Sequence, residues 1–166
     1  MPLSTQNKNA LHFLGIFFLV YFVFQFALLV VDLSFLENGL ANIEANWTGL
    51  SATENKIMTG DGVFIINPNC TGLVSAIILG GIVFGLKKPG LRKKLQLWVA
   101  GAIALFVINL GRLYLVVWTG KQYGIELAET IHVVSWFLTA LFIIVIWLIV
   151  TKKMTGVKSL SELISD

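Results

Sequence analysis

Four long apolar runs constrain this chain more than any other feature of its sequence. They cover residues 11–31, 71–86, 95–118 and 131–150. A helix needs about 17–25 apolar residues to cross roughly 30 Å of hydrocarbon, so three runs are long enough and the second is slightly short. The chain is 57% hydrophobic and 13% charged, with a mean hydropathy of +0.84, which is too apolar for a soluble domain. We therefore expect an all-α integral membrane protein in which residues 1–166 form a single domain, a bundle of four transmembrane helices.

The first and second apolar runs each have a feature that bears on their place in the membrane. The first is longer than the apolar core of a signal peptide and lacks a convincing small-residue cleavage site after it, so we expect it to be a span. The second carries Gly72, Ala76 and Gly80 at four-residue spacing. Small residues at this spacing let helix backbones approach closely, which predicts a place in the centre of the bundle.

The 12 Lys and Arg residues are distributed unevenly. Nine lie before the first run, in the loop "KKPGLRKK" at 87–94, or after the last run. Two others, Lys56 and Lys121, fall in the remaining loops, and Arg112 lies inside a run. Because cytoplasmic loops are rich in Lys and Arg, we expect both termini in the cytoplasm of a multi-pass cell-membrane protein. The net charge of +3 then reflects topology and gives no reason to expect nucleic acid as a partner.

The predicted extracytoplasmic segment, residues 32–69, has structure of its own. Apolar residues recur at spacings of four and three, the pattern of one helical face, at Leu36, Leu40, Ile43, Trp47 and Leu50. Polar residues, Glu44 among them, fall elsewhere on this helix. We expect an amphipathic helix on the outer membrane surface, with Trp47 at headgroup depth. In the following stretch "KIMTGDGVFII", two β-prone runs flank a turn, which predicts a short β-hairpin leading to Cys70.

The single cysteine lies in "NPNCTGL", residues 67–73, where this polar segment meets the second apolar run. Asn67 or Asn69 can cap a helix and Pro68 suits its first turn, so we expect Cys70 at a helix N-terminus. Exposed amides and the helix dipole favour the reactive thiolate there. A small residue packed at a helix start is the simpler interpretation of a lone cysteine, and it stays open.

Arg112 is the second candidate residue, because it lies inside the third run. Its Cα is about 9 Å from that of Trp118 along a helix. An arginine at the centre of a membrane costs roughly 2.5–3.5 kcal/mol, which makes a function the first hypothesis. Asn109 lies three residues earlier on the same face and can hydrogen-bond it. The alternative is an arginine that reaches the membrane surface and has no chemical role.

His132 is the third candidate residue and lies at the start of the fourth run. Ser135, Trp136 and Thr139 continue its face, a partly polar stripe that should face the bundle. A lone histidine at this depth is more often an interfacial residue than a catalyst. In the expected topology, however, Cys70, Arg112 and His132 all lie near the outer face. A nucleophile, a fixed cation and a proton carrier are what acyl transfer through a thioester requires.

Three motifs around these residues resemble the exosortase and archaeosortase family. They are "NCTGL" at 69–73, "NLGRLYL" at 109–115 and "HVVSW" at 132–136. The resemblance covers about residues 57–150, and the motifs are more similar to those of the archaeal members. We therefore expect a small archaeosortase-like member that resembles a minimal core of the larger family members. It implies that Cys70 is the nucleophile and that Arg112 and His132 complete the catalytic site. Asn109 belongs to the arginine motif, and Thr71 and Gly72 support the cysteine.

The resemblance also implies a substrate. Members of that family act on exported proteins that end in a short motif, a transmembrane helix and a basic cluster. They cleave at the motif and transfer the new C-terminus to a membrane lipid or another amine acceptor. For this chain the resemblance therefore implies a cysteine protease and transpeptidase with its active site at the extracytoplasmic face.

Other classes of membrane protein stay open. A non-catalytic scaffold or assembly factor would carry an inert Cys70 and an Arg112 paired with a partner's acidic residue. A channel or transporter is less compatible, because Arg112 and His132 line no path to the cytoplasm. No residues have metal-ligand spacing and no phosphate-binding loop is present, so we expect neither a metal nor another cofactor.

Overall fold

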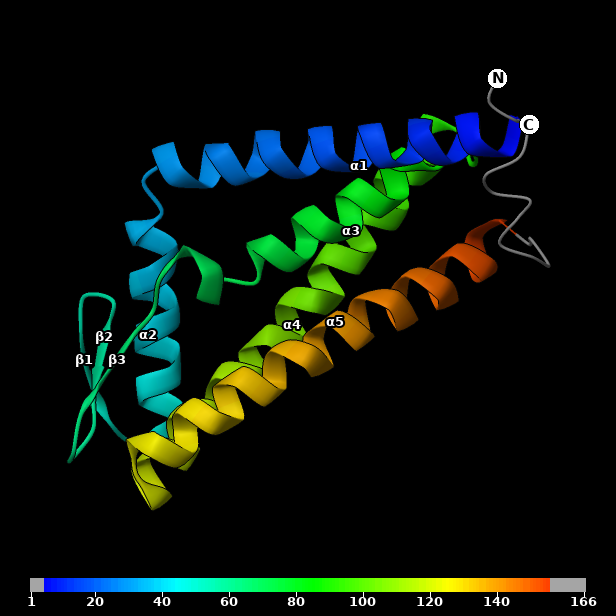
Figure 1. Ribbon diagram of the computed structural model, residues 1–166. Coiled ribbons are helices and arrows are strands. Elements are labelled where there is room, and N and C mark those ends of the chain that lie inside the picture. The colour runs from blue at the N-terminus through cyan, green and yellow to red at the C-terminus, as the bar shows by residue number, and fades with distance from the viewer. Residues whose placement is uncertain (1–4, 156–166) are drawn as a thin grey trace.

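The computed structural model describes residues 5–155, and four of its helices form the body of the molecule. Helix α1 (Thr5–Val30) runs along one side, and α4 (Leu91–Tyr123) and α5 (Ile125–Thr155) form an antiparallel pair oblique to it (Figure 1). The shorter helix α3 (Leu73–Gly85) lies between α1 and α4 and contacts both. The described part of the chain is therefore mostly helical, as the sequence predicts.

Within residues 5–155, three helices are long and apolar enough to cross a membrane. These helices are α1, α4 and α5. Helix α3 is apolar but has only 13 residues, about 20 Å at 1.5 Å per residue. The chain is thus a multi-pass membrane protein, and the count of four spans stays a prediction.

Close packing around α3 agrees with the expected central place of the second apolar run. A Cβ atom at Gly81 would lie 2.8 Å from the ring of Phe17, and one at Gly85 would lie 2.9 Å from that of Phe13, so α1 approaches the glycines directly. On the opposite side, Trp98 of α4 donates a hydrogen bond to the Ala76 carbonyl at 2.8 Å. Helix α3 is therefore held on two sides.

Helix α2 (Ser34–Thr48) lies across one end of the other helices, which we call the α2 end (Figure 1). It packs against α4, and Lys121 of α4 donates a hydrogen bond to the carbonyl of Thr48 at its last turn. A cation at a helix C-terminus is favourable because the terminal carbonyls are unpaired. In Figure 1, α1 begins and α5 ends at the opposite end.

A helix forms where the apolar spacing predicts one, but part of its predicted face is wrong. Glu44, expected to point away from the apolar face, is fully buried. Ile43 and Trp47 of the apolar face are 39% and 56% exposed, so their expected contact with the membrane stays a prediction. The buried residues are Leu40, Ala41, Glu44, Ala45 and Thr48. The face is rotated because α2 packs against both α4 and the following strands, which the spacing alone does not specify. Its place on a membrane surface stays a prediction.

Three short strands follow α2. They are β1 (Ser51–Thr53), β2 (Lys56–Met58) and β3 (Val63–Ile65), antiparallel in the order β1-β2-β3. The predicted hairpin is confirmed as β2 and β3, with the turn closed by hydrogen bonds from the amide and hydroxyl of Thr59 to the Gly62 carbonyl at 2.9 and 2.7 Å. Strand β1 was not predicted. Phe64 of β3 packs where a side chain at Gly120 would stand, which holds the sheet against α4.

Glu44 makes stability depend on pH. Neither of its carboxylate oxygens has a hydrogen-bond partner among residues 5–155, and burial raises its pKa from 4.5 to about 7. The folded protein therefore binds a proton that the unfolded chain releases between pH 4.5 and about 7. The contribution of Glu44 to the free energy of unfolding is largest below pH 4.5, falls as the pH rises to about 7, and does not change at higher pH.

We expect Glu44→Gln to remove this loss of stability between pH 4.5 and 7. Because Glu44→Leu also removes a buried unpaired polar group, it should raise the free energy of unfolding by about 1–3 kcal/mol at pH 8. Thermal unfolding in detergent, measured from pH 4.5 to pH 8, follows both effects. Glu37→Gln on the same helix is the control, since Glu37 is only partly buried and accepts a hydrogen bond from Asn55. A Glu44→Gln variant with the wild-type pH dependence would contradict the assignment.

Candidate functional site

Cys70 lies at the end of a short 3-10 turn, η1 (Pro68–Cys70), that precedes α3. The predicted caps are confirmed: Asn67 accepts a hydrogen bond from the Asn69 amide at 3.0 Å, and Pro68 occupies the first turn. The predicted α-helix N-terminus is wrong, because α3 begins only at Leu73. Cys70 therefore does not receive the full dipole of an α-helix.

The break between η1 and α3 is built from the two residues after the cysteine. Gly72 has a φ of +81°, a left-handed conformation that side chains disfavour, and a Cβ there would lie 3.2 Å from the Asn109 Cβ. Thr71 is fully buried, and its hydroxyl donates to the Pro68 carbonyl at 2.6 Å and accepts from the Leu73 amide at 3.3 Å. The Cys-Thr-Gly motif thus fixes the backbone that carries the thiol.

The thiol itself is buried. Cys70 is 7% exposed and lies in an apolar cluster contributed by α2, the sheet region, η1 and α4. The other buried members of this thiol cluster are Leu40, Ala41, Ala45, Ile57, Ile66, Leu113 and Val117. An unreactive, packed cysteine would have the same surroundings, so a chemical role depends on the polar groups nearby.

Asn109 connects Cys70 to the buried arginine. It is 2% exposed, and its Nδ2 donates a hydrogen bond to the Cys70 carbonyl at 2.7 Å. Its Oδ1 accepts one from Nη1 of Arg112 at 3.0 Å. Because one amide holds both groups, the positions of the cysteine backbone and the guanidinium are coupled.

Helix α5 holds the other side of Arg112. Its Nε donates to the Ser135 hydroxyl at 3.1 Å, and that hydroxyl donates to the His132 carbonyl at 2.7 Å. The guanidinium carbon lies 5.7 Å from the ring centroid of Trp136, a cation–π distance. Nη2 of Arg112 is buried and has no hydrogen-bond partner in the described part of the chain. Arg112 is therefore a fixed cation with N–H groups left to bind another oxygen.

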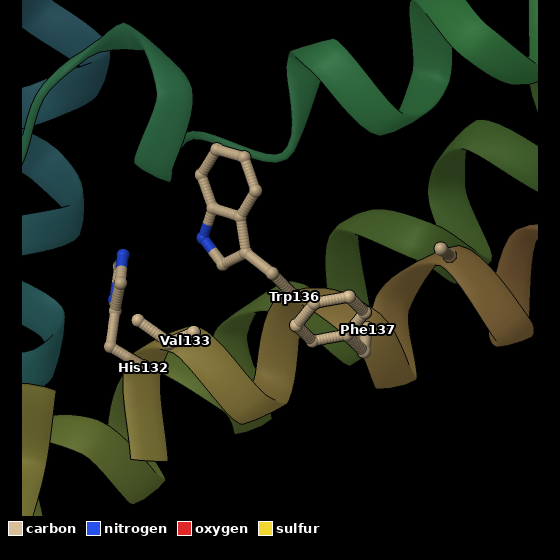
Figure 2. A pocket seen from close by; sticks show the side chains of 5 residues that line it. His132, Val133, Trp136 and Phe137 are labelled. Atoms are coloured by element: carbon tan, nitrogen blue, oxygen red, sulfur yellow. The ribbon is translucent and has the colours of Figure 1, made fainter. Parts of the chain in front are cut away.

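His132 is partly buried one helical turn from Trp136, with 6.1 Å between the two ring centroids. Figure 2 shows both side chains rising from α5 toward the η1 turn and its connection to α3. Through Asn109 and Ser135, the hydrogen bonds of Arg112 reach the backbone carbonyls of both Cys70 and His132. The structure thus brings the three predicted site residues, on η1, α4 and α5, into one hydrogen-bond network.

A pocket of about 550 Å³ lies beside this network. It is lined by His132, Val133, Trp136, Phe137 and Ala140, all on α5 (Figure 2). This pocket does not contain the whole candidate site, because neither Cys70 nor Arg112 is among its lining residues. Trp136 belongs to both the pocket and the network, because it lines the pocket and its ring is the cation–π partner of Arg112.

Sequence reasoning placed Ser135 and Trp136 on the polar stripe of His132 without giving either one a partner. The structure makes them direct contacts of Arg112. The signal was their spacing of three and four residues from His132, which puts all three on one helical face. What that face meets depends on how α5 packs on α4.

A comparison with known protein families gives a match. The model of the transmembrane exosortase family (Exosortase_EpsH) matches residues 7–150, a segment that contains Cys70, Arg112 and His132. Neither the curated proteins nor the solved structures contain a match. Because the match covers most of the 166 residues, the chain belongs to the transmembrane exosortase family.

Proposed function

We propose that this protein is a membrane-embedded cysteine protease and transpeptidase. It cleaves the C-terminal sorting tail of exported proteins through a thioester on Cys70 and passes the new C-terminus to a lipid or another amine acceptor. One observation carries the proposal: continuous hydrogen bonds run from the Cys70 carbonyl through Asn109, Arg112 and Ser135 to the His132 carbonyl. A cation is thereby fixed between the backbones of the two residues that carry the thiol and the imidazole.

The proposed reaction assigns a role to each of the three groups. The thiol proton passes to His132, and the sulfur attacks the scissile carbonyl carbon, so that a C–S bond forms. Nη2 of Arg112, which has no hydrogen-bond partner among residues 5–155, stabilises the resulting oxyanion. As the C–N bond breaks, His132 gives its proton to the leaving amine. The acceptor amine then attacks the thioester, loses a proton through His132, and regenerates the thiol.

The depth of the site supports a substrate with its own transmembrane helix. Arg112 lies 11 residues before the end of α4, which is about 16 Å along the helix. We propose that the α2 end is extracytoplasmic, since Lys152 and Lys153 lie in the last turn of α5 at the opposite end. The bilayer would then restrict a tail helix to an orientation in which its outer end meets Cys70.

A second candidate function is a non-catalytic membrane scaffold or assembly factor. It is favoured by the burial of Cys70 in the apolar thiol cluster, which is typical of an inert cysteine. In that case the hydrogen bonds of Arg112 would serve only to join α4 and α5. The two functions predict different effects of a conservative substitution at Cys70.

We expect Cys70→Ser to reduce cleavage to background while the protein still inserts and accumulates, because a hydroxyl is hardly ionised at neutral pH. The measurement is cleavage of a tailed substrate in membranes at matched expression. Cys70→Ala is the control for loss of the nucleophile alone, and thermal unfolding checks that both variants stay folded. Near-normal cleavage by Cys70→Ser would exclude the thioester mechanism and favour the scaffold.

We expect Arg112→Lys to slow cleavage by about 100- to 1000-fold, the usual effect of losing one oxyanion donor. Lysine keeps the charge but loses the planar guanidinium that binds Asn109, Ser135 and an oxyanion together. Arg92→Lys is a matched control on the same helix, because Arg92 is exposed. His132→Ala should have a milder effect than Cys70→Ser or Arg112→Lys, with exposed His12→Ala as its control. Normal cleavage by Arg112→Lys would remove the oxyanion role.

The proposed topology predicts that the loop at 87–94 is cytoplasmic. A Lys88→Cys probe on a Cys70→Ala background should therefore resist a membrane-impermeant thiol reagent in sealed cells and react after permeabilisation. A cysteine placed at the exposed Glu54 between β1 and β2 should react in sealed cells. The reverse pattern of labelling would invert the orientation.

A further inference from the structure

The pocket on α5 is mostly apolar and lies within a candidate membrane span. Four of its five lining side chains are apolar, and the exception is His132. Trp136 and Ala140 lie 11 and 15 residues from the first residue of α5, which is about 16 and 22 Å along the helix. This part of α5 belongs to a candidate membrane span, so whatever occupies the pocket is in contact with hydrocarbon.

The pocket borders the candidate active site. His132 and Trp136 line it, Trp136 lies 5.7 Å from the guanidinium carbon of Arg112, and the His132 carbonyl accepts a hydrogen bond from Ser135, which binds Arg112. A smaller cavity of about 280 Å³ shares His132 and Val133 with it and extends to Phe64 of the sheet and Val116 of α4. A chain lying along α5 would therefore pass from the α2 end, beside His132, to Ala140.

We propose that the pocket binds the first apolar residues of the substrate's tail, those on the membrane side of the scissile bond. This inference rests on the proposed function and adds the site that selects among substrate tails. The exported part of a substrate lies in water beyond the α2 end, and only its tail enters hydrocarbon. An apolar pocket deeper than His132 therefore fits the leaving segment and does not fit the segment that becomes the thioester.

Two consequences follow for the residues of the pocket. The nitrogen of the scissile bond is the first atom of the leaving segment, so binding in the pocket brings that nitrogen to His132, which supplies its proton. Ala140 is the smallest lining residue, and it leaves the room that a large tail side chain fills. Trp136 forms the wall toward Arg112 and separates the tail from the cation.

The test fills the pocket without disturbing the core. Ala140→Trp places a large ring on an exposed position of α5, and Leu138→Trp, also exposed but outside the pocket, is the matched control. Cleavage is measured as a single turnover without acceptor, so that only thioester formation contributes. We expect Ala140→Trp to slow this step about tenfold or more, the scale of discrimination in an apolar pocket, and Leu138→Trp to leave it unchanged.

A second variant tests the same pocket in the opposite direction. Phe137 is 75% exposed, and Phe137→Ala enlarges the pocket without removing a buried residue. We expect Phe137→Ala to shift the substrate preference toward tails with bulkier first residues. Tails in which these first residues are replaced by Ala should restore cleavage by Ala140→Trp. This rescue by a changed substrate would not occur if Ala140→Trp acted only by distorting the protein.

The outcomes separate this inference from the proposed function. Normal cleavage by Ala140→Trp together with loss of cleavage in Cys70→Ser would overturn the tail pocket and leave the thioester mechanism in place. Normal cleavage by Cys70→Ser would exclude the mechanism itself. If Ala140→Trp slowed only transfer to a lipid acceptor, the pocket would bind an acyl chain, and the tail assignment would be wrong.

Discussion

A cation held inside a membrane protein is the constraint on which this structure depends. Arg112 sits in the span-length helix α4, where an unpaired charge is costly, and its partners come from α4 and α5. Asn109 binds the guanidinium with one end and the Cys70 backbone with the other. The cost of leaving these donors and acceptors unpaired therefore brings η1, α4 and α5 together at one point.

The same region combines stabilising contacts with features that reduce stability. The thiol cluster joins α2, the sheet region and α4 over Cys70, whereas Glu44 is buried in α2 without a hydrogen-bond partner among the described residues. Gly72 adds a left-handed turn against Asn109. Such features are commonly found where function sets the geometry, and here they lie in the elements around Cys70.

Local patterns predicted the elements more accurately than their contacts. The lengths of the apolar runs predicted the three long helices, and the Thr-Gly-Asp-Gly turn predicted the β2–β3 hairpin. Both predictions succeeded because hydrophobic periodicity and turn chemistry act over a few residues. The burial of Glu44 in α2 was not predicted, since it depends on packing against elements distant in sequence. The 3-10 turn at Cys70 was missed because Gly72 breaks the helix where it meets Asn109 of another helix.

The sequence by itself determined that this chain enters a membrane, where its long helices lie, and that Cys70, Arg112 and His132 are the unusual polar groups among them. Composition and local spacing are sufficient for that, because the energy of placing each residue type in hydrocarbon is a property of the residue. Only the tertiary structure decided that Ser135 and Trp136 bind Arg112, that the thiol is covered by α2, and that a pocket opens beside His132. These features depend on the rotation and tilt of each helix against its neighbours, which are set by packing across elements and not by any single segment.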